Sequence, residues 1–287
     1  MNTMRILLAA LLALLCLGGH AFAADPLPRT AWLEHGFVQV YDFGSLTLHA
    51  YGTVDPLGDV CYVLETDTNL VGIESPAFHV NVDEWKRYVE GLRKPLTDIL
   101  VSYHPAGGPW YGEAVSHATR STIQAVSEGG TKALTTSFGH TFGPGYNTDI
   151  PPIDAVLLPG PNTIGGIAFD IVGEGDGYDI GIPSMQAIYV HMLGADTHSL
   201  ITGKDSLTAA IASLERIRGK GYRLILSGHH LPETSADVAD KIAYLETMKD
   251  LLAANAGKQA FIDAMIRAYP NNGGLEYLTL SAEYLFP

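Results

Sequence analysis

The sequence is poor in cysteine and in basic residues. Its 287 residues include 2 Cys, and 17 Lys and Arg stand against 31 Asp and Glu, so the formal net charge is −14. A chain this negative is a poor fit to a nucleic-acid groove or an anionic membrane surface, because both recruit clustered Lys and Arg. With 47% hydrophobic and 17% charged residues, the composition is that of a folded protein with a large core.

Several well-known catalytic motifs are missing as well. The chain has no Gly-x-Ser-x-Gly, which removes the sequence basis for a serine nucleophile elbow. It also has no P-loop, no Gly-x-Gly-x-x-Gly after a strand and no His-Glu-x-x-His. The 11 His residues are therefore the natural place to search for chemistry.

A hydrophobic run too short to span a membrane stands at the N-terminus. Arg5 precedes the apolar run 6–17, and Ala21-Phe22-Ala23 fits the small-x-small cleavage rule. A spanning helix needs about 20 apolar residues, so residues 1–23 are predicted to be a signal peptide cleaved near Ala23. We expect a periplasmic or secreted protein without membrane attachment. The exported chain keeps only Cys61, which excludes an intramolecular disulfide and lies in an apolar run typical of a buried, inert thiol.

The hydrophobic pattern of the mature chain predicts strands, then strand–helix units, then helices. Apolar runs bounded by Gly, Asp, Asn and Pro indicate strands, and apolar residues at i, i+3, i+4 and i+7 indicate helices. Segment 129–166 has weak periodicity and is predicted to be a long loop. The predicted strands are 37–41, 46–51, 61–65, 70–73, 98–102, 167–172, 187–193, 199–202 and 222–227, and the predicted helices are 82–92, 112–127, 206–218 and most of the chain after His230. This order predicts one α/β domain over residues 24–287, an αββα sandwich of two mixed β-sheets with outer helices and a C-terminal helical extension from about residue 236.

The strand that runs into Tyr103-His104 places side chains at a sheet edge, where sites collect. Together with four further blocks, it resembles the metallo-β-lactamase superfamily over roughly residues 38–230. The His104 segment resembles the His-x-His-x-Asp-His motif of that family. The other blocks are Glu74-Ser75-Pro76 at the family's Asp-x-Gly, Gly181 to Ser184 at its Gly-His-Thr-Pro-Gly turn, Ser199 to Asp205 at the strand leading to its bridging Asp, and Leu224 to His229 at the strand carrying its last His.

The resemblance implies a divergent member with a degenerate metal site. Of seven ligand positions at most three keep a ligating side chain, namely His104, Asp205 and His229. The motif Asp and its neighbouring His fall on Ala106 and Gly107. A catalytic zinc takes about three protein ligands and an open position, and a two-metal site needs more than these three. We therefore expect either no metal or a single weakly bound zinc-type ion.

Two functions remain open at this stage. In the first, the protein has lost hydrolysis and is a pseudoenzyme that binds a small molecule or supports a partner protein. In the second, it is a mononuclear metal-dependent hydrolase of an ester, lactone, lactam or thioester, with His104, Asp205 and His229 as catalytic and metal-ligating residues. Candidate ligand-binding or orienting residues are Glu74, Tyr103, Trp110, Tyr111 and His140. Either hypothesis predicts that His104 and His229 face one another with Asp205 within reach. Without a bound cation, Asp205 is expected to raise the pKa of both imidazoles.

Overall fold

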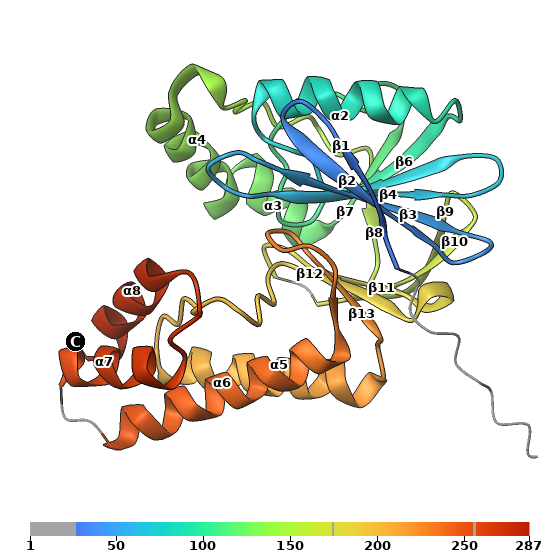
Figure 1. The fold of residues 1–287 in the computed structure, drawn as a ribbon. Coiled ribbons are helices and arrows are strands. Elements are labelled where there is room, and N and C mark those ends of the chain that lie inside the picture. The colour runs from blue at the N-terminus through green and yellow to red at the C-terminus, as the bar shows by residue number, and fades with distance from the viewer. Residues whose placement is uncertain (1–26, 174, 255–256, 287) are drawn as a thin grey trace, which may run out of the picture.

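Two β-sheets pack face to face and carry helices on their outer sides (Figure 1). The computed structural model describes residues 27–173, 175–254 and 257–286. The core between the sheets takes apolar side chains from both, such as Leu64 and Ile73 from the first sheet and Phe169, Ile180 and Leu226 from the second. The predicted αββα architecture is confirmed.

The first sheet has eight strands in sequence order, β1 to β8. Strands β1 to β5 form an antiparallel meander, and β6, β7 and β8 are then added in parallel. Strand β4 is buried along almost its whole length because the second sheet covers one face and helix α2 the other. The strand bounds are β1 Arg29–Trp32, β2 Gly36–Asp42, β3 Thr47–Thr53, β4 Val60–Glu65, β5 Leu70–Ile73, β6 Leu96–Leu100, β7 Val115–Thr119 and β8 Ala155–Leu157.

The second sheet has six strands in the order β14-β13-β12-β11-β10-β9. Within it, β12 and β13 are parallel neighbours, so their carboxyl ends meet at the same edge. The bounds are β9 Gly160–Ile164, β10 Ile167–Val172, β11 Asp179–Ile182, β12 Ala187–Val190, β13 Leu224–Ser227 and β14 Glu233–Thr234.

Helices cover both outer faces. Helix α2 (His79–Gly91) packs Val82, Trp85 and Val89 on the first sheet, as its predicted apolar stripe requires. Helices α5 (Lys204–Lys220), α6 (Ser235–Ala254), α7 (Lys258–Ala268) and α8 (Leu275–Leu285) form a second apolar cluster with β12 and β13. Helices α3 (Arg120–Ser127) and α4 (Gly130–Phe142) complete the fold beside the first sheet. Among the described residues, none of the helices is long and apolar enough to cross a membrane.

Three predicted elements are wrong. The helix predicted over 112–127 begins only at Arg120, because Val115–Thr119 pairs with β6 and Thr119 then caps α3. The loop predicted over 129–166 contains α4, β8 and β9. The strand predicted over 199–202 is absent, because the Ser281 hydroxyl of α8 takes the hydrogen bonds of this backbone, at 2.7 Å from Ile201 N and 2.9 Å from Ser199 O.

Cys61 is buried, as predicted. The predicted signal peptide, residues 1–23, lies outside the described residues.

Candidate metal centre

Three histidines meet where the carboxyl ends of strands from both sheets come together. His104 follows β6, His191 directly follows β12, and His229 follows β13. The Nε2 atom of His229 lies 3.2 Å from Nε2 of His104 and 3.2 Å from Nε2 of His191. All three ligand atoms lie within 4.8 Å of one another, and within the described part of the chain this is the one group of three or more metal-capable side chains.

Two of the three separations between the nitrogens have the value expected for ligands of a tetrahedral metal ion, and the third is at most 4.8 Å. Zinc binds imidazole nitrogen at about 2.0–2.1 Å, so two ligands of a tetrahedral ion lie about 3.3–3.4 Å apart. The two separations of 3.2 Å match that value. Because three histidines supply three ligands, a tetrahedral ion held here would keep a fourth position for water, as catalytic zinc sites do.

The imidazoles are held in the neutral form that metal binding requires. Burial lowers the pKa of His104 to about 4. Burial, followed by repulsion from the neighbouring rings, lowers the pKa of His191 and of His229 to about 3. The expected rise in these pKa values is therefore wrong, because Asp205 is not beside the rings and desolvation dominates.

Glu74 fixes the backbone that carries His104. Its fully buried carboxylate accepts the backbone N–H of Ser102 (3.2 Å), Tyr103 (2.6 Å) and His104 (3.0 Å), and the hydroxyl of Tyr189 (2.9 Å). This places Glu74 as a positioning residue, in keeping with the orienting role expected for it.

Gly228 makes room for the His104 ring. A Cβ atom at Gly228 would lie 2.6 Å from Cε1 of His104, which explains the glycine before His229. The Nδ1 atom of His104 is buried and has no hydrogen-bond partner in the protein.

His229 is oriented through its second ring nitrogen. Its Nδ1–H donates to the carbonyl of Leu57 at 3.3 Å, which leaves the Nε2 lone pair free to face the other two histidines. Oδ1 of Asp59 also lies 3.3 Å from Nδ1 but makes no hydrogen bond. Burial raises the pKa of Asp59 well above its usual range, and the carboxyl groups of Asp55 and Glu74 add to the shift.

Tyr103 supports His191. The two rings stack with their centroids 4.6 Å apart and an interplanar angle of 14°. The Tyr103 hydroxyl in turn donates to Asp179 Oδ1 at 3.1 Å. Burial raises the pKa of Asp179 to about 6, against the lowering effect of the Tyr103 hydrogen bond.

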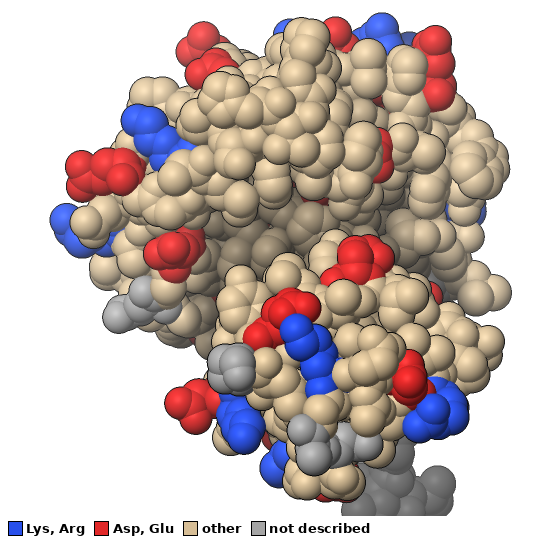
Figure 2. Space-filling model, turned by 90° about the vertical axis from the view of Figure 1, so that its left-hand side faces the viewer, with Lys and Arg blue, Asp and Glu red and all other residues tan. Residues whose placement is uncertain are grey.

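The three histidines lie on the wall of a cavity of about 660 Å³. One side of it comes from α4, through Leu134 and Phe138, and the opposite side includes Tyr277 of α8. Asp59 also lines it. Figure 2 shows a hollowed face with mostly uncharged side chains around the hollow and acidic side chains near its edge.

Comparison with solved structures identifies the fold. No protein-family model and no curated protein matches the sequence. Among solved structures, a metallo-β-lactamase family protein from Thermus thermophilus has a TM-score of 0.58 at 15% identity, over 84% of this chain and 91% of that protein. The chain has the metallo-β-lactamase fold.

A second structure with this fold covers the chain more fully. The sec-alkylsulfatase Pisa1 from Pseudomonas sp. has a TM-score of 0.54 at 15% identity, over 90% of this chain and 50% of that protein. A metallo-β-lactamase from Erythrobacter litoralis has a TM-score of 0.50 at 12% identity, over 76% of this chain and 99% of that protein. At these identities the likeness concerns the fold alone.

Within the metallo-β-lactamase fold, the structure brings together two of the three residues predicted as metal ligands. His104 and His229 face one another, as predicted. Asp205 does not join them: it is exposed in the first turn of α5 and lines neither of the two cavities that His191 lines. The strand expected before it does not form, so the chain reaches Asp205 on the outside of the fold.

Two predicted ligand-binding residues are core residues. Trp110 and Tyr111 are 6% and 9% exposed and pack with Trp85, and the Trp110 Nε1–H donates to Ser75 Oγ at 2.9 Å. The expectation that these two side chains contact a ligand is therefore wrong, because both are buried in the core.

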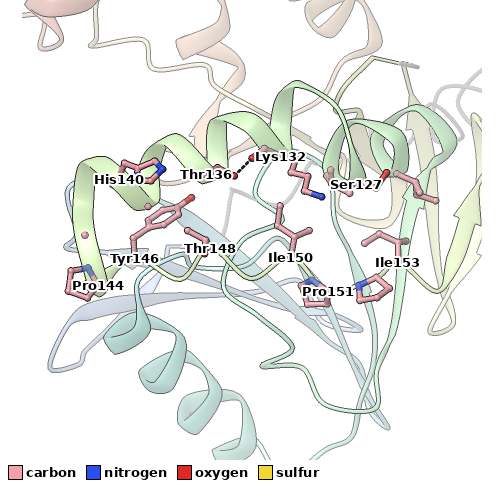
Figure 3. Close-up of a pocket in the computed structure, with 15 residues that line it drawn as sticks. Ser127, Lys132, Thr136, His140, Pro144, Tyr146, Thr148, Ile150, Pro151 and Ile153 are labelled. Atoms are coloured by element: carbon pink, nitrogen blue, oxygen red, sulfur yellow. Dashed lines mark hydrogen bonds between the residues drawn. The ribbon is translucent and has the colours of Figure 1, made fainter.

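His140 belongs to a different cavity, shown in Figure 3. That cavity, of about 890 Å³, is larger than the one at the histidines and lies between α4 and segment 144–153. Its labelled polar side chains include Lys132, Thr136 and His140. The Thr136 hydroxyl donates to the backbone carbonyl of Lys132 at 2.9 Å. Tyr146 lines both cavities and stands between them.

His191 and Asp59 were missed from the sequence. The segment 187–193 was predicted to be strand throughout, which hides the fact that β12 ends at Val190 and that His191 follows it at the sheet edge. An apolar strand followed by a His within a few residues is the pattern that singled out His104 and His229, and it occurs here a third time. Asp59 directly precedes β4, and no motif marks it.

Proposed function

We propose that this protein is a hydrolase that depends on a single metal ion held by His104, His191 and His229. The observation that carries the proposal is that Nε2 of His229 lies 3.2 Å from Nε2 of both other histidines, on the wall of an accessible cavity. A zinc-type ion held there supplies Lewis acidity and lowers the pKa of a water molecule toward neutrality. One observation supports the alternative, a binding protein without hydrolysis. Among the described residues, this group contains no carboxylate that would hold a second ion.

The residues around the three histidines have separate tasks. Glu74, the Leu57 carbonyl and Tyr103 hold His104, His229 and His191 respectively, so the donor set is preorganised. Asp59 is the group that can move a proton, because its Oδ1 lies 3.3 Å from Nδ1 of His229 without a hydrogen bond, the residue lines the cavity, and burial raises its pKa. The apolar walls formed by α4 limit the access of bulk water.

The test is metal content together with hydrolysis. The purified chain, loaded with zinc and freed of excess, should hold about one equivalent and should hydrolyse at least one member of a panel of p-nitrophenyl esters, lactones and nitrocefin. His191→Ala should lose both zinc and turnover, because two nitrogens do not form a catalytic zinc site. His140→Ala is the matched control, since this exposed His lies in the other cavity and should leave both unchanged.

Two results would decide against the proposal. Zinc binding that survives His191→Ala would place the metal elsewhere. Full zinc occupancy without hydrolysis of any member of the panel would favour the binding protein.

We infer that the protein works after export, from the apolar segment 6–17 and the small-x-small sequence that follows it. N-terminal sequencing of the protein recovered from the periplasm or the medium should begin at Ala24. A protein that retains Met1 in the cytoplasm would contradict this inference.

A further inference from the structure

A second cavity adjoins the one at the histidines. It measures about 440 Å³ and lies between the second sheet and helices α5 and α6. Four residues line both cavities, namely Tyr103, His191, Leu200 and Tyr277. A molecule whose polar end contacts the three histidines can therefore place its other end in the second cavity, past His191.

The walls of this second cavity are mainly hydrocarbon. Apolar side chains come from the end of β12 and the segment after it, from α5 and from α6. These are Val190, Met192, Leu193, Ile201, Ala210, Leu214, Ile217 and Leu245. Such a lining favours an apolar occupant, because each buried methylene is withdrawn from water.

The polar groups in these walls are already engaged. The buried Lys241 ammonium donates to the carbonyls of Gly194 (2.8 Å) and Thr197 (2.6 Å). Asp179 accepts the Tyr103 hydroxyl and lies 4.0 Å from the Arg216 guanidinium. Two N–H groups of Lys241 and the carboxylate of Asp179 thus already have partners in the protein, so these side chains have little hydrogen-bonding capacity left for an occupant.

The segment between β12 and α5 exposes hydrocarbon beside both cavities. Met192 is 37% exposed and Leu200 is 44% exposed. Both side chains line the second cavity. A molecule that extends from the three histidines into the second cavity would cover Met192 and Leu200.

We propose that the second cavity binds the unbranched hydrocarbon chain of the substrate, an acyl or alkyl chain attached to the group that is hydrolysed at the three histidines. The proposal rests on the proposed function for the identity of the reacting end. The hydrocarbon chain of the substrate passes His191 and lies against α5. Substrates with a medium-length hydrocarbon chain are therefore preferred over acetyl analogues.

The first test measures binding alone, so that it does not depend on turnover. Hexanoate, octanoate and decanoate are titrated into the zinc-loaded protein by calorimetry, with acetate as the reference. The affinity should rise about fourfold for each added methylene until the cavity is filled. Ala210→Phe, which fills the cavity from α5, should remove this rise, whereas Ala209→Phe on the exposed side of the same helix should keep it.

A milder pair of variants covers the case in which Ala210→Phe disturbs folding. Met192→Ser removes exposed hydrocarbon from the cavity wall and should weaken decanoate binding several-fold. Leu280→Ser removes a similarly exposed apolar side chain, 42% exposed, that lines neither cavity, and should have no effect.

The second test separates this proposal from the proposed function. Chain-length dependence of binding in a protein that hydrolyses none of the p-nitrophenyl esters would support the hydrocarbon site and overturn the hydrolase. Turnover of p-nitrophenyl acetate as fast as that of the decanoate, in wild type and in Ala210→Phe, would overturn the hydrocarbon site and leave the hydrolase standing. Equal affinity for acetate and decanoate would also overturn it.

Discussion

His104 and His191 both lie beside His229 in the candidate metal centre, and they are supported in different ways. The backbone at His104 is held by Glu74, which is fully buried and accepts three N–H groups. The segment after His191 is held by Glu233, which is only partly buried and accepts the N–H of Gly194 (3.1 Å) and Ala195 (2.8 Å).

The difference separates the rigid side of the site from the adaptable side. Buried hydrogen bonds to a carboxylate are costly to break, whereas partly exposed ones are exchanged for water at little cost. The His104 side therefore keeps its geometry, and the His191 side, which borders both cavities, is the one that can adjust to a substrate.

The largest effect is expected from removing the buried support. Glu74→Ala leaves three backbone N–H groups and the Tyr189 hydroxyl without their acceptor. We expect a loss of about 3–5 kcal/mol in the free energy of unfolding, measured by urea denaturation of the metal-free protein. Zinc affinity should fall at least tenfold, because residues that hold ligands typically contribute about 10–100-fold.

The matched variant on the other side is Glu233→Ala. It removes two partly exposed hydrogen bonds, so we expect a loss of about 1–2 kcal/mol. Equal losses for the two variants would contradict the division into a rigid and an adaptable side.

A smaller effect is expected from acid. The folded pKa of His104 is about 4, below the 6.5 of an unperturbed His, because the ring is buried. Below pH 6.5, His104 binds a proton in the unfolded chain but not in the folded chain. The free energy of unfolding therefore falls as the pH drops from about 6.5 to about 4, and this contribution levels off below about pH 4. The contribution of His104 alone is on the order of 3 kcal/mol.

The measurement compares the metal-free wild type with His104→Asn. Urea denaturation at several pH values should show a shallower fall for the variant between pH 6.5 and 4. Parallel curves for the two proteins would mean that His104 is accessible to protons, which would place it on the adaptable side as well.

The sequence predicts strands β2 to β6, β10, β12 and β13, because these are apolar runs bounded by turn residues; it misses the others, such as β7 to β9, which lack such a run. It also predicts the His104–His229 pair, because both residues follow such runs. It fails at Asp205, where the expected strand over 199–202 is replaced by hydrogen bonds to Ser281, 82 residues from Ser199 along the chain. A contact this distant leaves no local pattern, and it decides on which side of the fold the chain passes.

The same failure concealed His191. A one-dimensional pattern does not show where a strand leaves its sheet, and the run Ala187 to Leu193 is nearly continuous in its hydrophobicity. The strand ends at Val190 because its partner β13 ends opposite it at Ser227, a pairing between residues far apart in the sequence.

The smallest effect is expected at Tyr103, which sharpens the comparison on the His191 side. Tyr103→Phe keeps the ring that stacks on His191 and removes the hydrogen bond to Asp179. We expect a change below about 1 kcal/mol in the free energy of unfolding and a less than tenfold loss of zinc affinity. Tyr103→Ala also removes the stacked ring and should lower zinc affinity by about 10–100-fold.

Competition with a chelator of known affinity measures the loss for both variants. The matched control is Tyr88→Phe, since the Tyr88 hydroxyl lies 2.8 Å from Nδ1 of His49, a Tyr–His pair outside the site. Zinc affinity should be unchanged in this control. If Tyr103→Ala also left zinc affinity unchanged, the stacked ring would not position His191. His191 itself would then be positioned by its backbone contacts, such as the N–H of Gly228 that donates to the His191 carbonyl at 2.9 Å.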